Sequence, residues 1–323
     1  MRKQMKIVTL IMALIVMLTA FGIPTAAAES QTQILNILFL VCEGTGKAFT
    51  PMMPMIVTLD FEKTSIRVIS FYYQTQIDAV TKKGKALSMP MNFLSYCDLP
   101  EIVKAYENTF GIPIDRYLVY QYRYGSYEPV VGVFDMLGSV TLDVSGEVLG
   151  DEEYTTINGN MKALSKSMKR EYTPVTQAGP QALDSLGLIA YYSAIPDRVW
   201  ASGDRFTMMM EDYKFWDAKN RAVIEALKPI ISLMSTGVSH AFLQLITGNQ
   251  ITDITADDIA AWAVIPFNFP DEAPYFTAPG FEGVEMRDFD AGALTGVGGY
   301  DAKMLSYDNA AMIAHIREFI YGQ

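Results

Sequence analysis

Residues 34–42, ILNILFLVC, form a near-continuous apolar run close to the start of the chain. A strand with one face in water alternates apolar and polar residues, whereas an uninterrupted apolar run is typical of a strand buried on both faces. The run therefore predicts the central strand of a sheet that is covered on both sides. Residues 43–46, EGTG, follow it as a predicted turn.

The segments that follow this run interleave strands and helices. Strands are predicted at Met55–Phe61 and Ser65–Tyr73, joined by a polar turn at 62–64. Asp98 opens a predicted helix that Gly111 ends, since glycine readily takes the left-handed conformation after a last helical turn. Further strands are expected over 115–122 and 139–144, and helices over 129–137, 180–194, 206–234 and 309–321, with another beginning at Thr255.

The segment order predicts one α/β domain with a mixed central β-sheet flanked by helices on both faces. No linker-like Ser/Pro run interrupts residues 29–323. We therefore expect the C-terminal segment 251–323 to belong to the same domain.

The composition excludes several classes of protein. Half of the 323 residues are hydrophobic and 19% are charged, a balance that excludes a disordered chain, a collagen-like fibre and a coiled coil. The 25 Lys and Arg residues stand against 36 Asp and Glu residues, and the formal net charge is −11. Nucleic-acid binding depends on clustered Lys and Arg that displace counterions, so this balance argues against a nucleic-acid partner.

The N-terminus has the pattern of a secretory signal peptide. Arg2, Lys3 and Lys6 precede the apolar run 7–21 and three alanines at 26–28, which form a small-residue cleavage site. We therefore expect a signal peptide at residues 1–28, a mature chain that begins at Glu29, and an extracytoplasmic protein that is secreted or associated with the cell surface. An uncleaved N-terminal membrane anchor is the alternative, because the apolar run approaches the length of a membrane span.

The cysteines and histidines are too few for a disulfide scaffold or a zinc site. Cys42 and Cys97 are the only cysteines, and either a single bridge or two buried thiols is compatible with an exported chain. His240 and His315 are the only histidines, and neither has a partner at the spacing that zinc sites use. No histidine lies near a nucleophile motif, which argues against a Ser-His-Asp or Cys-His catalytic set.

Methionines gather in two short stretches, at Met52, Met53 and Met55 and at Met89 and Met91. Methionine is flexible and adapts to irregular surroundings. The stretches therefore have two interpretations: they fill the protein core, or they line a pocket for a long apolar ligand.

Two longer stretches resemble the LytR-CpsA-Psr family, which acts on the bacterial cell envelope. Residues 110–117, FGIPIDRY, look like the family's GIPIDRY stretch. Residues 134–144, FDMLGSVTLDV, match its VDxLGGVxVDV run, with Ser139 in place of one glycine. Residues 36–40, 55–60, 179–191, 220–227, 278–280 and 316–319 also fit the family's order of segments, so the resemblance covers essentially the whole mature chain.

This resemblance implies a mixed α/β sheet that encloses a hydrophobic tunnel. Family members hold a polyprenyl-phosphate-linked glycopolymer there and transfer it to peptidoglycan. The pyrophosphate needs Arg side chains, whose planar fork binds phosphate oxygens bidentately, and a divalent ion such as Mg²⁺ held by Asp.

The chain departs from the family at the positions that carry this charge. Thr50, Met52 and Met53 stand where the family has Arg and then Asp, and Tyr73 and Gln74 stand where it has Arg and Asp. The two Arg residues that the family has after Tyr191 fall on Ser193 and Ile195. Since neutral side chains are poor ligands for a hard divalent ion, we predict no metal site and no cofactor.

The remaining candidates for a phosphate or ligand pocket are Arg198, Arg205, Lys219 and Arg221, together with Tyr73, Gln74 and Thr50. Two main hypotheses follow from this set. The first is a non-catalytic or weakly catalytic binder of polyprenyl-phosphate-type lipid or cell-wall glycopolymer. The alternative is an active glycopolymer–peptidoglycan phosphotransferase with a rebuilt basic site at Lys219, Arg221 and Arg205. Peptidoglycan or an active paralogue of the same family are further partners that the resemblance suggests.

Overall fold

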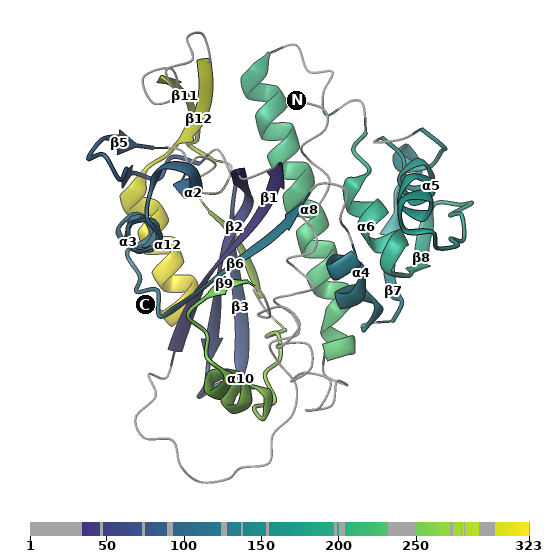
Figure 1. Ribbon diagram of the computed structural model, residues 1–323, viewed down its shortest axis with the longest axis horizontal. Coiled ribbons are helices and arrows are strands. Elements are labelled where there is room, and N and C mark those ends of the chain that lie inside the picture. The colour runs from purple at the N-terminus through teal and green to yellow at the C-terminus, as the bar shows by residue number, and fades with distance from the viewer. Residues whose placement is uncertain are drawn as a thin grey trace.

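The computed structural model describes residues 34–322 except 46–47, 73–74, 89–92, 124–127, 137, 153–154, 197–198, 200–203, 232–249, 272–273, 279, 281 and 291–300. A central sheet lies between two layers of helices (Figure 1). The predicted leader, residues 1–28, lies outside the described residues. Within the described part of the chain, no helix combines the length and the apolar character needed to span a membrane.

The central sheet is mixed and has six strands in the order β10-β3-β2-β1-β6-β9. Its strands are β1 (Ile34–Thr45), β2 (Ala48–Asp60), β3 (Ser65–Phe71), β6 (Arg116–Arg123), β9 (Ile251–Thr252) and β10 (Tyr275–Ala278). The apolar run 34–42 lies in β1, which pairs antiparallel with β2 and parallel with β6. The mixed central sheet expected from the sequence is therefore confirmed.

The two faces of the sheet bury separate hydrophobic cores. Ile37, Phe39 and Val41 of β1 point to one face, and Leu38 and Leu40 point to the other. The first face packs against α4 (Glu128–Asp135), α5 (Ile157–Met168), α6 (Ser185–Ser193), α8 (Arg205–Ile231), α10 (Ala256–Ala263) and the hairpin of β7 (Val140–Val144) and β8 (Gly179–Leu183). The second face packs against α2 (Phe93–Tyr96), α3 (Leu99–Phe110) and α12 (Asn309–Tyr321).

Smaller elements complete the described chain. The hairpin of β4 (Ala79–Val80) and β5 (Ala86–Leu87) lies beside α2 and α3 at one edge of the molecule (Figure 1). A second hairpin pairs β11 (Glu285–Asp290) with β12 (Asp301–Ser306), and η2 (Gly146–Val148) is a single 3₁₀ turn.

Local signals fixed several helix ends. Asp98 precedes α3, and Gly111 ends it in the left-handed conformation with φ 65°. Thr255 and Asp258 form a capping box at α10, so each satisfies a backbone N–H that the first helical turn leaves without a partner. The ends of α12 coincide with the predicted range 309–321.

Two sequence predictions need correction. Residues 43–45 continue β1 instead of turning, because β1 and β2 stay paired up to Thr45 and Ala48. The helix predicted over 180–194 begins only at Ser185, since residues 179–183 pair with β7 as strand β8 and Asp184 caps the helix. Helix α5 was not predicted; Thr156 caps it at Gly159 N.

The two cysteines do not form a bridge. Cys42 and Cys97 are both free and buried in the core that contains α3, which supports the alternative of two buried thiols. Burial raises the pKa of both thiols, so both are inert as nucleophiles at neutral pH.

Candidate functional site

Helix α8 carries the polar residues that are candidates for a functional site. It crosses the first face of the sheet and lies between that face and α6 (Figure 1). Asp217, Asn220 and Arg221 contact Tyr275 and Thr277 of β10, whereas Asp212 and Lys219 contact other partners. We refer to the first group, with Ser70, Tyr275 and Thr277, as the Arg221 cluster.

Arg221 is held in place by three neighbours. Its Nε donates to Asp217 Oδ2 at 2.9 Å, and its Nη2 donates to Thr277 Oγ1 at 3.2 Å. The guanidinium carbon lies 4.8 Å from the centre of the Tyr275 ring, in the geometry of a cation–π contact. These bonds use two of the five N–H donors of the guanidinium, while the Arg221 side chain is 50% exposed.

A buried hydrogen-bond network fixes the residues behind Arg221. Thr277 donates its hydroxyl to Asp217 Oδ1. The Tyr275 hydroxyl pairs with Ser70 Oγ and accepts a bond from Asn220 Nδ2 at 3.2 Å. Burial raises the pKa of Tyr275, so its hydroxyl stays neutral and keeps its place in the network. The sheet and α8 therefore hold one guanidinium in a defined orientation.

Lys219, only two positions away, serves a different purpose. Its Nζ donates to the carbonyl oxygens of Tyr191, of Tyr192 at 3.2 Å and of Ala194 at 2.6 Å. The last carbonyls of a helix have no intrahelical donor, so the ammonium group satisfies the end of α6. Because an ammonium has three N–H donors, these three bonds use all of them.

Aromatic rings close around the Lys219 ammonium group. Nζ lies 4.4 Å from the centre of the Phe215 ring and 4.9 Å from that of Tyr191, and Lys219 is 5% exposed. Burial lowers the pKa of Lys219, and the charge of Asp212 opposes that shift. The three carbonyls and the ring faces also favour the charged form.

Asp212 is a second buried carboxyl group on α8, besides Asp217. It accepts bonds from the Tyr72 hydroxyl at 3.1 Å and from Trp216 Nε1 at 3.0 Å. Burial raises the pKa of Asp212 to about 7, although Tyr72, Trp216 and Lys219 oppose that shift. Asp212 thus titrates near neutral pH. Its bond with Tyr72 also links α8 to the end of β3.

The structure does not bring the three basic candidates on α8 together. Arg205 is exposed at the first residue of α8, and 14 residues of helix separate it from Lys219 by about 21 Å. Lys219 and Arg221 lie about 200° apart around the helix axis. A single basic site built from all three is therefore incompatible with the helix.

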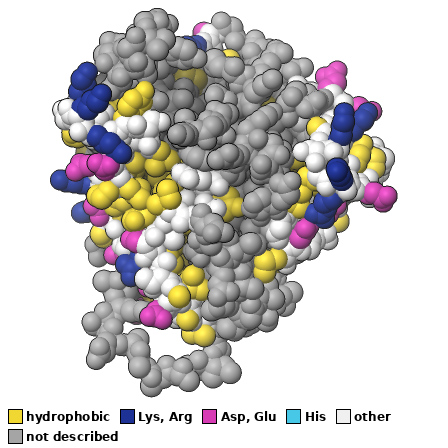
Figure 2. Space-filling view, viewed as in Figure 1, with side chains coloured by type: hydrophobic (Ala, Val, Ile, Leu, Met, Phe, Trp, Pro, Cys, Tyr) yellow, Lys and Arg dark blue, Asp and Glu magenta, His cyan; other side chains and the backbone are white. Residues whose placement is uncertain are grey.

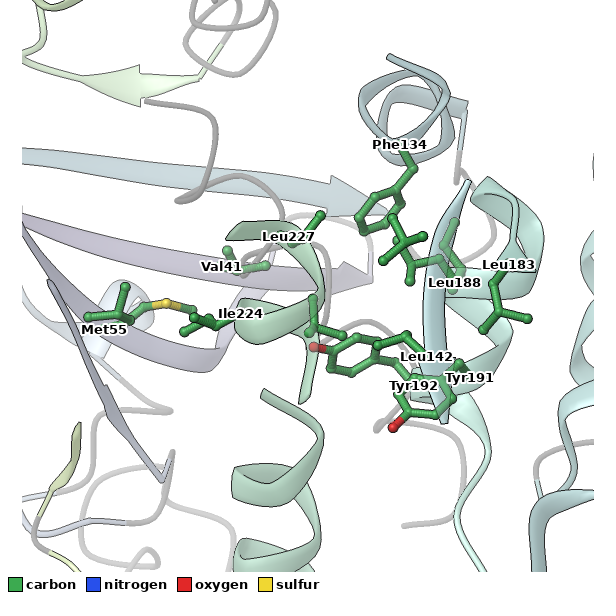
Figure 3. Packing of buried hydrophobic residues seen from close by; sticks show 14 of the residues in the cluster. Val41, Met55, Phe134, Leu142, Leu183, Leu188, Tyr191, Tyr192, Ile224 and Leu227 are labelled. Carbon is green, nitrogen blue, oxygen red and sulfur yellow. The ribbon is translucent and has the colours of Figure 1, made fainter. Parts of the chain in front are cut away.

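Several other predicted site residues fall outside the described residues. These are Tyr73, Gln74, Arg198, Met89 and Met91. Thr50, Met52 and Met53 lie in β2, but their side chains are not described. Met55 is fully buried in the core beside Ile224 of α8 (Figure 3), as the core-filling interpretation expects for this residue.

The positions where the family resemblance places two Arg residues carry buried neutral side chains. Ser193 is 4% exposed and donates to Ile189 O at 2.9 Å, and Ile195 is 5% exposed. Both flank Ala194, one of the carbonyls that Lys219 caps. In this chain the end of α6 is thus buried and carries no charged side chain of its own, and the cation beside it is Lys219 of α8.

Most of the Arg221 cluster was not predicted from the sequence. Asp217 precedes Arg221 by four residues, a spacing that places both side chains on one side of a helix, and this pattern could have been noticed. Ser70, Tyr275 and Thr277 carry no such signal, because they come from strands more than 50 residues away along the chain.

The described residues do not fit a divalent metal ion. No group of three or more His, Cys, Asp and Glu side chains is placed to hold one in the described part of the chain. Asp217 already bonds Arg221 and Thr277, and Asp212 bonds Tyr72 and Trp216.

No protein-family profile and no curated protein matches the sequence, but solved structures match the fold. TagV from Bacillus subtilis has a TM-score of 0.58 at 16% identity, over 90% of this chain and 98% of that one. TagT bound to LIIa-WTA has a TM-score of 0.52 at 12% identity, over 91% and 94%. A transcriptional regulator from Enterococcus faecalis has a TM-score of 0.51 at 15% identity, over 89% and 88%.

At identities this low the likeness shows the fold alone. TagV and TagT are members of the LytR-CpsA-Psr family. The protein therefore has the fold of that family, as the resemblance in residues 110–117 and 134–144 implied.

Proposed function

We propose that this protein works in the cell envelope, where it binds a polyprenyl-phosphate-type lipid or a cell-wall glycopolymer and transfers it to peptidoglycan slowly or not at all. The observation that carries this proposal is the contrast between Arg221 and Lys219. Arg221 offers a half-exposed guanidinium in a fixed orientation, which suits the binding of a phosphate oxygen. The solved complex of TagT with LIIa-WTA supports a ligand of this class for the fold.

Binding of a phosphate and its transfer make different demands on the site. A pyrophosphate leaving group gathers negative charge in the transition state, and preorganised cations or a metal ion must stabilise that charge. Lys219 is committed to the carbonyls of α6, and Ser193 and Ile195 are neutral. Loss of one such donor typically slows a reaction by about a hundred- to a thousand-fold. The arrangement therefore favours binding over transfer.

The test of binding measures the affinity of the purified full chain for undecaprenyl phosphate in detergent micelles. Because a hydrogen bond to a charged group contributes about 1.5–3 kcal/mol, Arg221→Ala should weaken binding by about ten- to a hundred-fold. Arg170→Ala is the matched control, since Arg170 also pairs with one carboxylate, Asp135, on another part of the surface. Equal affinities of the Arg221 variant and wild type would contradict the proposal.

The test of transfer incubates the chain with a polyprenyl-pyrophosphate-linked saccharide, peptidoglycan and magnesium, beside an active family member. We expect turnover far below that of the active protein. Comparable turnover that Arg221→Ala abolishes would instead establish the alternative, an active phosphotransferase with a rebuilt basic site.

We further propose that the chain is exported and that cleavage after Ala28 releases a mature protein beginning at Glu29. The support is the sequence pattern of residues 1–28. Intact-mass measurement of protein released from cells should show a chain that lacks these residues. Full-length protein confined to the membrane fraction would favour the uncleaved anchor.

A further inference from the structure

The β4–β5 hairpin presents three lysines on a rigid turn. Residues 81–85, TKKGK, connect the two strands. Thr81 N donates to Lys85 O, and Lys85 N donates to Thr81 Oγ1, at 2.8 and 2.9 Å. Gly84 takes the left-handed conformation with φ 74°. The turn thus holds Lys82, Lys83 and Lys85 in one exposed arrangement.

The hairpin is also fixed to the rest of the fold. Lys82 N donates to Tyr96 O at 2.9 Å, which joins the turn to the end of α2. Lys104 of α3 is exposed on the helix that contacts β4. Because both neighbours belong to the core that contains α3, the lysines are displayed by a rigid surface.

The charge of this surface differs from that of the whole molecule. Four lysines, at 82, 83, 85 and 104, stand among three exposed carboxylates, Asp78, Asp98 and Glu101. Asp98 pairs with Lys82 at 3.0 Å, and Asp78 accepts a bond from Ser88. The local balance is positive in a chain whose formal net charge is −11. An anionic partner would therefore approach this edge in preference to the acidic remainder of the surface.

An exposed apolar side chain accompanies the lysines. Val80, at the end of β4, is 50% exposed, and it is one of only three large hydrophobic residues so exposed in the described part of the chain. Figure 2 shows apolar and basic side chains next to one another at the edge where Figure 1 places β5, α2 and α3. Lysines that flank an apolar group are characteristic of surfaces that bind at the interface of a lipid bilayer.

A second group of lysines on the opposite side of the molecule lacks this apolar component. Lys162, Lys166 and Lys169 lie along α5 and its C-cap, and all three are exposed. Val80, Ile251 and Val264, the exposed large hydrophobic residues of the described chain, all lie on other elements. The α5 lysines therefore provide a comparison of equal charge without the apolar contact.

We propose that the β4–β5 hairpin docks the protein on an anionic lipid bilayer, with Lys82, Lys83 and Lys85 at the headgroups and Val80 at the acyl boundary. A basic residue near an anionic membrane contributes about 1 kcal/mol, which corresponds to about five-fold in affinity for each lysine. This docking is independent of the Arg221 cluster, which lies on the other face of the sheet. It would place the domain in a fixed orientation on the membrane surface.

The experiment measures co-sedimentation of the purified full chain with vesicles of phosphatidylglycerol and phosphatidylcholine, and with vesicles of phosphatidylcholine alone. We expect the triple variant Lys82→Gln/Lys83→Gln/Lys85→Gln to lose about a hundred-fold in partitioning onto the anionic vesicles. The variant Lys162→Gln/Lys166→Gln/Lys169→Gln, with the same change in net charge, should bind like wild type. Val80→Ser, which leaves every charge in place, should also weaken the binding.

Several outcomes would overturn the proposal. Equal losses in the two triple variants would show a response to net charge alone. Equal binding to neutral and anionic vesicles would show insertion by another segment, such as residues 1–28. Stronger retention by soluble polyglutamate than by vesicles would show a site for anionic polymers instead. Circular dichroism would verify that each variant is folded. If the triple variant is not folded, Lys83→Gln alone replaces it, with an expected loss of about five-fold in partitioning onto the anionic vesicles.

Discussion

Lys219 and Arg221 show how two neighbouring cations on one helix come to have different roles. Lys219 reaches the carbonyls at the end of α6, whereas Arg221 reaches Asp217 and Thr277. Their directions differ because two helical positions are about 200° apart. Sequence spacing places both on α8 but does not show which one faces water. The exposure of Arg221 makes it the candidate for contact with an anion.

Lys219→Met should destabilise the protein substantially. Methionine keeps an unbranched side chain but removes the donors to Tyr191, Tyr192 and Ala194, and the buried Asp212 loses the cation that opposes its desolvation. Removing one partner of a buried charged set costs about 3–5 kcal/mol. We therefore expect the free energy of unfolding, measured in urea, to fall by about 3 kcal/mol.

Lys214→Met provides the control on the same helix. Lys214 is 50% exposed and lies 3.5 Å from Glu211, and an exposed pair of this kind contributes less than about 1 kcal/mol. If the two variants lost equal stability, the cap on α6 would not be the source of the effect.

Asp212 should make the stability depend on pH. Burial raises its pKa from 3.8 to about 7, so between these values the folded chain keeps a proton that the unfolded chain releases. The free energy of unfolding should therefore fall as the pH rises from about 4 to about 7, and level off above it. A difference of about three pKa units corresponds to at most about 4 kcal/mol.

Urea unfolding of wild type and Asp212→Asn across this pH range tests the expectation. Asparagine can still bond Tyr72 and Trp216 but does not titrate in this range, so the variant should lack this part of the pH dependence. Asp98→Asn, at an exposed carboxyl group, should retain it. Parallel stability curves for wild type and Asp212→Asn would assign the pH dependence to other groups.

At the scale of the elements, the C-cap of α3 fixes the contact with α12. Gly111 has φ 65°, and a Cβ added there would lie 2.8 Å from Ile313 Cγ2 of α12. Gly84 has a similar φ of 74°, but nothing lies within 4 Å of an added Cβ. The two glycines share the same backbone requirement and differ in their surroundings.

Gly111→Ala should therefore cost more stability than Gly84→Ala. Both substitutions place alanine in the left-handed region, at about 1–2 kcal/mol. Gly111→Ala also forces α12 away from α3, and such overpacking adds about 1–3 kcal/mol. The melting temperature of Gly111→Ala should therefore lie below that of Gly84→Ala. Adding Ile313→Ala to the Gly111→Ala variant should recover part of the lost stability. Equal melting temperatures of the two single variants would show that α12 yields without cost.

The elements that the sequence predicted well have local causes. The C-terminal end of α3, the start of α10 and both ends of α12 depend on caps within the segment itself, and β1 depends on its own apolar run. Residues 179–183 were missed as a strand because their pairing partner, β7, lies more than 30 residues earlier. The Arg221 cluster was missed for the same reason, since Thr277 and Ser70 reach α8 only through the folded sheet.

At the scale of the whole molecule, the last quarter of the chain completes the sheet started by the first. Strand β9 pairs with β6, and β10 pairs with β3, so both edges of the central sheet come from residues after 250. Ile66 N donates to Asn268 O at 2.9 Å, and Phe61 packs against Phe267 with ring centres 5.2 Å apart. Helix α12 also supplies buried residues to the core that contains α3.

These long-range contacts predict that the chain folds as one cooperative unit. Trp216 and Trp262 belong to the same core although α8 and α10 are separate in sequence. Their fluorescence and the far-ultraviolet circular dichroism should therefore follow a single transition in urea. A chain that ends at Gln250 lacks β9, β10 and α12, and it exposes the edges of β3 and β6 and the apolar face of α3. We expect this truncated chain to unfold without a cooperative transition. A sharp transition in the truncated chain would show that residues 251–323 form an independent unit. Two separate transitions in the full chain would show the same.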